Sequence, residues 1–314
     1  MAISIGSAVG AGFNLISRRP VSVIAWGFFL YFSIVLLFAL GIVVVGVSVF
    51  GKLSSLNGMT DPTQVSQAMV GVLLALWPAL VIVAIGALLI GAVVQGAVYR
   101  AILMPEEKGF FSLRLGGREM ALVLLSLLIF VMAIVFEGLS IVLIGGVFYL
   151  ATRIGNFVGP LLAVLFCIFY ALAFMWVALR FSMAGPMTFA EGRVRFFGSW
   201  ALTRGNGWSL FGLAWVMVLV FIGVSIASGI VGGIVNLIFG GGMSALLMGS
   251  SGASSNPDSA AQFAAHWPVL LLAAIPSLLL NAVIQGLTQA IAQGPWVDVY
   301  RQLKGAPDVS HAFT

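Results

Sequence analysis

Six long stretches of apolar residues decide what this chain can fold into. They cover residues 21–50, 69–98, 120–150, 156–179, 208–239 and 267–291. Each exceeds the length of about 20 residues that an α-helix needs to cross the hydrocarbon core of a bilayer. An open sheet edge would leave backbone polar groups unpaired in lipid, so every span is expected to be helical. The sequence therefore predicts an all-α, polytopic integral membrane protein with six transmembrane helices.

Charged residues are too scarce for a soluble domain of this size. They make up 7% of the 314 residues, and 61% of the residues are hydrophobic. Soluble domains carry about 25% charged residues, and no soluble fold hides this much apolar surface. We therefore expect one membrane domain over residues 1–314, with a loose tail at 306–314.

The basic residues predict how the chain is oriented. Among 14 lysines and arginines, only Lys52 and Arg153 fall on one side of the predicted membrane. The positive-inside rule then places both termini in the cytoplasm. The expected location of the protein is the inner (plasma) membrane. Attraction of basic residues to anionic headgroups accounts for the net charge of +5. Membrane lipids are the expected partners, and no nucleic-acid partner is expected.

One stretch of sequence occurs twice. Residues 77–96 read WPALVIVAIGALLIGAVVQG, residues 267–286 read WPVLLLAAIPSLLLNAVIQG, and more than half of the positions are identical. Each stretch is the second helix of a predicted hairpin. The loops before these helices end in Asp61-Pro62 and Asn256-Pro257, pairs that suit a helix start. The repeat predicts that hairpins are the building unit.

A short helix at the cytoplasmic interface is expected to precede each hairpin, because an apolar segment and a basic cluster precede the spans. The apolar face of the first such helix would carry Ile5, Val9, Phe13 and Ile16. A later helix would place four aromatic residues on one face: Phe189, Phe196, Phe197 and Trp200. We therefore expect three units, 1–103, 104–187 and 188–305, of which the second has diverged.

A motif pattern occurs at residues 180–211, which read RFSMAGPMTFAEGRVRFFGSWALTRGNGWSLF. Its elements are Arg180, Pro186, Glu191-Gly192, Ser199-Trp200 and the LTRG run at 202–205. The pattern resembles YciC-like bacterial inner-membrane proteins and the membrane domain attached to some glycerophosphodiester phosphodiesterases. VYRQLKG at 299–305 is similar to the end of the family pattern. The resemblance implies a six-span inner-membrane protein of a family whose function is poorly defined. It does not imply phosphodiesterase activity, because catalysis in the fused proteins belongs to a separate soluble domain.

A few polar side chains inside the predicted spans are the candidates for a solute path. They are Gln95, Glu137, Asn236, Asn281 and Gln285. Intramembrane carboxylates often mark ion paths. Counted from residue 120 at about 1.5 Å per residue, however, Glu137 lies about 25 Å from the inner end of its span. This depth favours a position near the outer interface or a pair with Arg153. Gln95 and Gln285, equivalent in the repeat, are expected to hydrogen-bond between helices.

Charged residues at the inner boundary are expected to cluster. The candidates are Arg180, Glu191, Arg204 and Arg301. Isolated charges are unfavourable at the edge of the hydrocarbon core. We therefore predict that Glu191 contacts Arg180, Arg195 or Arg204.

Small residues spaced by four, Ser225, Gly229 and Gly233, form a potential helix-packing face in the fifth span. Such a face lets another helix approach closely. Packing within the chain is favoured over a dimer contact.

No catalytic residue, cofactor site or metal site is expected. Cys167, His266 and His311 are too few and too scattered for a zinc site, and no paired carboxylates occur within the spans. We expect a non-enzymatic protein with a structural or envelope-maintenance role that binds lipid through its basic face. The alternative is a transporter or channel for a small solute or lipid, which requires the five intramembrane polar side chains to converge on one cavity.

Overall fold

The computed structural model describes residues 3–54, 61–106, 112–113, 116–154, 157–240 and 258–305. The regular secondary structure of these residues is helical throughout. Six helical segments of the described chain are long and apolar enough to cross a membrane: Pro20–Gly46, Thr63–Leu103, Gly117–Ile154, Val158–Glu191, Gly207–Phe239 and Ala274–Lys304. Each overlaps one of the six predicted stretches, which confirms the class of an all-α, polytopic membrane protein.

The first hairpin consists of α2 (Pro20–Ser54) and α3 (Pro62–Leu103), and α1 (Ile5–Arg18) precedes it. Asp61 caps α3 as predicted, since its carboxylate accepts hydrogen bonds from the Thr63 hydroxyl at 2.7 Å and the Thr63 amide at 2.9 Å. These hydrogen bonds lower the pKa of Asp61 below its ordinary value. The corresponding pair Asn256-Pro257 lies outside the described residues.

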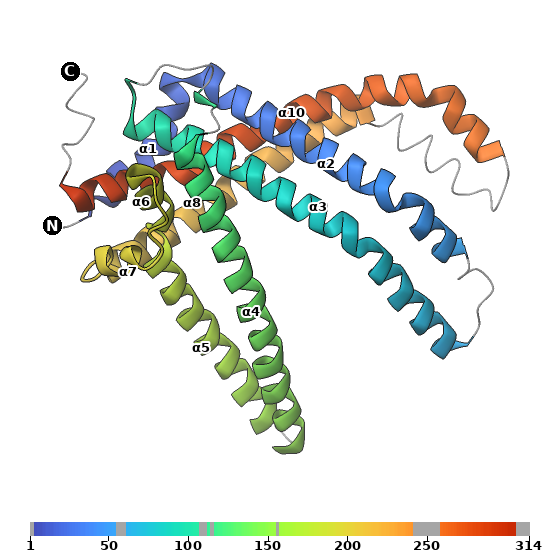
Figure 1. Ribbon diagram of the computed structural model, residues 1–314, viewed down its shortest axis with the longest axis horizontal. Coiled ribbons are helices and arrows are strands. Elements are labelled where there is room, and N and C mark those ends of the chain that lie inside the picture. Colours follow the sequence, from blue (N-terminus) through green and yellow to red (C-terminus); the bar gives the residue numbers. More distant parts are fainter. Residues whose placement is uncertain are drawn as a thin grey trace.

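The second hairpin, α4 (Gly117–Ile154) with α5 (Val158–Phe181), extends away from the first. The two pairs diverge from a common end of the molecule, near which α1, α6 (Ala184–Glu191) and α7 (Gly198–Leu202) lie (Figure 1). The remaining long helices are α8 (Gly207–Val235), which continues into the π-helical turn η2 (Asn236–Gly240), and α10 (Asp258–Lys304).

Helix α10 is central to the packing of the common end, because it contacts α1, α2, α3 and α8. Small residues recur at every fourth position along its packed side: Ala282, Gly286, Ala290 and Gly294. A Cβ added to Gly286 would lie 2.2 Å from the Val23 carbonyl oxygen of α2, and one added to Gly294 would lie 2.7 Å from the Gly12 backbone of α1. Close crossings of α10 with α1 and α2 therefore bring these helices together at the common end.

The described residues do not show the predicted packing of Ser225, Gly229 and Gly233 within the chain. All three residues are exposed on α8, and a Cβ added to Gly229 or Gly233 would meet no described atom within 4 Å. Small residues spaced by four indicate that another helix can pack closely against that face. When several helices carry such a face, the spacing does not indicate which of them is packed.

The predicted interfacial helices differ from the observed ones. Helix α1 forms where expected, but it packs along α10, so Ile5, Val9 and Ile16 contact the core while Phe13 stays exposed. The aromatic residues after 188 do not share one helical face. Gly192 ends α6 in the left-handed region (φ 70°). The chain beyond that turn then buries Phe196, as α6 buries Phe189, but leaves two aromatic side chains exposed: Phe197 and Trp200.

Candidate functional site

A pocket of about 570 Å³ lies where α1, the C-terminal end of α3 and the C-terminal part of α10 meet. Small residues of α1, Gly6, Gly10 and Ala11, form part of its wall. Its charged lining residues are Arg18, Arg19, Glu106, Asp298 and Arg301. The pocket therefore combines three guanidinium groups with two carboxylates at the end of the molecule where the helices converge.

Helix α1 packs against α10 with one side and lines the pocket with another. Ala8, Gly12 and Leu15 are its buried residues, and Gly12 touches the α10 backbone. Ser7 and Asn14 project from a different side and line the pocket. The last turn of α1 carries Arg18, a favourable position for a cation at the negative end of the helix dipole.

Two sets of hydrogen bonds fix the ends of the pocket. At one end, the Arg19 guanidinium donates to the Pro105 carbonyl oxygen at 3.2 Å and so ties α1 to α3. At the other end, the Ser7 hydroxyl and the Gln302 amide donate to Oδ2 of Asp298 at 3.4 and 2.8 Å. Ser7 and Arg18 are separated by about 16 Å along α1 at 1.5 Å per residue, so the pocket has two distinct polar ends.

The charged residues predicted to cluster at the inner boundary separate into different sites. Arg180 donates to the Thr203 carbonyl oxygen at 2.7 Å and lies over the Trp176 ring. Arg204 is exposed, and Arg301 lines the pocket. The structure therefore does not bring these arginines to Glu191.

Glu191 makes one of the predicted contacts. Its Oε2 accepts a hydrogen bond from Arg195 Nε at 2.7 Å, which confirms that Glu191 pairs with one of the three named arginines. Its Oε1 lies 3.5 Å from Lys304 Nζ at the end of α10. Glu191 therefore links α6 to α10 rather than to the end of α5.

The intramembrane polar side chains do not converge within the described structure. Gln95 is half-buried and donates to the Tyr99 hydroxyl at 2.7 Å and to Gln293 at 3.4 Å, which links α3 to α10. The other four are exposed: Glu137, Asn236, Asn281 and Gln285. Gln95 and Gln285 thus differ in environment despite their equivalence in the repeat, and only Gln95 has the predicted interhelical hydrogen bonds.

Glu137 follows a residue at which the two helices of its hairpin are in contact. The neighbouring Phe136 stacks on Phe174 of α5, with ring centroids 4.9 Å apart. At 1.5 Å per residue, Phe174 is about 9 Å from Arg180 along α5. Arg153 donates to the Tyr149 hydroxyl at 2.7 Å, and the described residues show no ion pair between Arg153 and Glu137. Of the two predicted alternatives for Glu137, the pair with Arg153 is therefore not formed, and the position near the outer interface stays a prediction.

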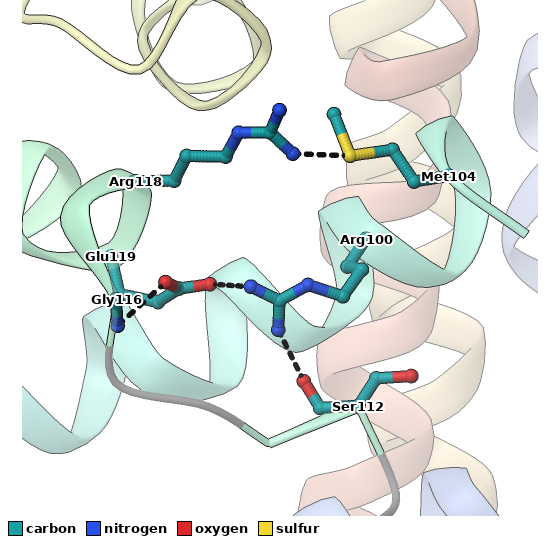
Figure 2. Close-up of polar contacts among 6 residues, drawn as sticks. All are labelled: Arg100, Met104, Ser112, Gly116, Arg118 and Glu119. Atoms are coloured by element: carbon teal, nitrogen blue, oxygen red, sulfur yellow. Dashed lines mark hydrogen bonds and ion pairs between the residues drawn. The ribbon is translucent and has the colours of Figure 1, made fainter. Parts of the chain in front are cut away.

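A buried ion pair between Arg100 and Glu119 joins the two hairpins (Figure 2). The side chains are 6% and 1% exposed. Arg100 Nη1 also donates to the Ser112 carbonyl oxygen at 2.7 Å, and the Gly116 amide donates to Glu119 Oε2 at 3.0 Å. Sequence reasoning missed this pair because both residues fall just outside the predicted spans, where charges are ordinarily solvated.

The surroundings of this pair explain how two charges are accommodated inside the protein. The buried Phe189 ring of α6 lies under the Arg100 guanidinium, 5.6 Å from its centroid. Gly96 leaves the space that the Glu119 side chain occupies, since a Cβ there would approach Glu119 Cγ to 3.0 Å. Paired, hydrogen-bonded charges are the form in which ions are tolerated in a protein interior. The arrangement indicates a structural joint.

Comparison of the chain with protein-family models, with curated proteins and with solved structures finds no match. The fold defines the class, a polytopic membrane protein with six candidate spans. The pocket between α1, α3 and α10 is the candidate site for a ligand.

Proposed function

We propose that this chain is a non-enzymatic bacterial inner-membrane protein that binds phospholipid headgroups, in a structural or envelope-maintenance role. The observation that carries the proposal is the pocket lined by Arg18, Arg19 and Arg301. Guanidinium groups form paired, charge-assisted hydrogen bonds with phosphate oxygens. The pocket volume of about 570 Å³ falls within the range of about 300–1,000 Å³ typical of small-molecule sites.

The proposal includes an orientation and a repeat. Both termini lie in the cytoplasm, supported by the concentration of basic residues on one side. Three hairpin units, 1–103, 104–187 and 188–305, build the domain, supported by the duplicated stretch and by the packing of α2 on α3 and of α4 on α5. The YciC-like pattern at 180–211 supports the same layout. Transport of a solute is less well supported, because four of the five candidate side chains are exposed and only Gln95 is half-buried.

The orientation predicts the behaviour of reporter fusions. Alkaline phosphatase, which is active only outside the cytoplasm, should have low activity when fused to the C-terminus. The same enzyme inserted between α2 and α3, within residues 55–60, should be active, since the proposal places this point on the opposite side of the membrane. High activity of the C-terminal fusion, at equal expression, would contradict the proposed orientation.

Headgroup binding predicts a requirement for the three arginines of the pocket. The full chain, purified in detergent, should bind an equimolar mixture of phosphatidylethanolamine and phosphatidylglycerol more tightly than diacylglycerol of the same acyl chains. The triple change Arg18→Gln, Arg19→Gln, Arg301→Gln should weaken phospholipid binding by about tenfold or more, because hydrogen bonds to charged groups contribute about 1.5–3 kcal/mol each. Native mass spectrometry measures the bound lipid.

A matched control separates the pocket from net charge. The change Arg153→Gln, Arg193→Gln, Arg204→Gln also removes three positive charges, from exposed positions outside the pocket. It should leave binding close to that of the parent chain. Equal losses in the two triple variants, or no preference for phospholipid over diacylglycerol, would refute the proposed site.

A further inference from the structure

The pocket presents charges of both signs, which a site for a purely anionic ligand does not need. Asp298 and Glu106 line it together with the three arginines. Asp298 is only partly exposed, and a carboxylate withdrawn from water is unfavourable unless a donor or cation compensates it. A site built only to hold a phosphate would gain from an uncharged residue at position 298.

The Asp298 side chain is held in place. Ser7 and Gln302 both donate to its Oδ2, and Gln302 also donates to the Ser7 hydroxyl at 2.9 Å. The Ser4 amide in turn donates to Gln302 Oε1 at 2.8 Å. The described residues place no hydrogen bond on the second carboxylate oxygen, Oδ1. The network therefore orients a carboxylate in the pocket wall and leaves one of its oxygens for another donor.

Arg301 lies three residues after Asp298 on α10 and also lines the pocket. Three residues correspond to a rise of about 4.5 Å, and side chains at this spacing are neighbours on the helix surface. A carboxylate and a guanidinium on neighbouring positions of one helix face suit a ligand whose ammonium and phosphate are joined by a short, two-carbon linker.

We infer that this end of the pocket binds an ethanolamine phospholipid headgroup, with the primary ammonium on Asp298 and the phosphodiester on Arg301. The inference rests on the proposed function and narrows it to one class of headgroup. A choline headgroup has the same charges, but its quaternary nitrogen has no N–H to donate to Asp298. A glycerol headgroup has no cation to compensate the carboxylate.

Native mass spectrometry of the purified full chain tests this inference with four lipids of identical acyl chains. These are phosphatidylethanolamine, phosphatidylcholine, phosphatidylglycerol and diacylglycerol. The parent chain should bind phosphatidylethanolamine about tenfold more tightly than phosphatidylcholine, as expected for one added hydrogen bond between charged groups. Asp298→Asn should remove this preference and leave binding of phosphatidylglycerol unchanged or tighter, whereas Asp298→Glu should keep part of it.

Glu137→Gln is the control variant, because it removes one carboxylate from an exposed position on α4 that does not line the pocket. It should bind all four lipids as the parent does. Equal binding of the ethanolamine and choline lipids by the parent chain would overturn the inference, and so would an equal loss of both phosphatidylethanolamine and phosphatidylglycerol in Asp298→Asn. Equal binding of phosphatidylglycerol and phosphatidylethanolamine above diacylglycerol would overturn the headgroup assignment alone. Failure of every phospholipid to exceed diacylglycerol would overturn the proposed function as well.

Discussion

Replacing Glu119 by glutamine should destabilise the protein by about 3–5 kcal/mol, the range measured when one partner of a buried ion pair is removed. The Glu119 side chain is 1% exposed and its partner Arg100 is 6% exposed. Glutamine keeps the size of the side chain but leaves the buried guanidinium without its counter-charge. Unfolding of the detergent-solubilised chain, followed by tryptophan fluorescence during denaturant titration, measures the loss.

Two further variants test whether the loss of stability comes from breaking a buried ion pair. Glu191→Gln breaks an ion pair whose side chains are 20% and 44% exposed, and it should cost about 1 kcal/mol or less, as exposed pairs do. The double change Arg100→Met, Glu119→Leu removes both buried charges and should be more stable than Glu119→Gln alone. If Glu119→Gln loses no more stability than Glu191→Gln, the buried pair is not the joint that we describe.

The position of the Arg100–Glu119 pair explains why its loss should affect the whole molecule. Arg100 lies near the end of α3 and Glu119 near the start of α4, where the first two hairpins diverge (Figures 1 and 2). Phe189 of α6 packs against the Arg100 guanidinium. A single pair of side chains therefore links both hairpins and the segment that follows α5.

The sequence predicted features that depend on local pattern. Apolar length identified the six spans, an Asx-Pro pair identified the start of α3 at Asp61, and charge complementarity identified a partner for Glu191. These features need only neighbouring residues or a bulk property of the segment. The break between α6 and α7 also has a local cause, Gly192. The sequence interpretation nevertheless assigned one helical face to this segment, because four aromatic residues occur there at near-helical spacing.

Features that depend on tertiary contact were not predictable from one sequence. The pocket joins Ser7, Glu106 and Asp298, which are distant in the chain and share no motif. The buried pair joins two charges that lie at the ends of apolar stretches, where solvated charges are the usual case. Small-residue spacing occurs in both α8 and α10, and only the packed structure distinguishes them.

Replacing Gly286 by alanine should destabilise the protein by about 3 kcal/mol, the upper end of the usual range for overpacked sites. The added methyl group would lie 2.2 Å from the Val23 carbonyl oxygen and 3.1 Å from the Gly27 backbone, so α2 and α10 would have to separate. Backbone atoms cannot move aside as a flexible side chain can. The unfolding titration used for Glu119→Gln measures this loss.

Gly286 has an equivalent in the repeated stretch. The last residue of the stretch is Gly96 in one copy and Gly286 in the other. Gly286 admits the backbone of α2, whereas Gly96 admits the Glu119 side chain. Gly229→Ala makes the same chemical change on α8 with no described atom within 4 Å. That control should be neutral or gain up to about 1 kcal/mol, since alanine favours a helix over glycine. Equal stability of the two alanine variants would show that α2 and α10 do not cross at Gly286.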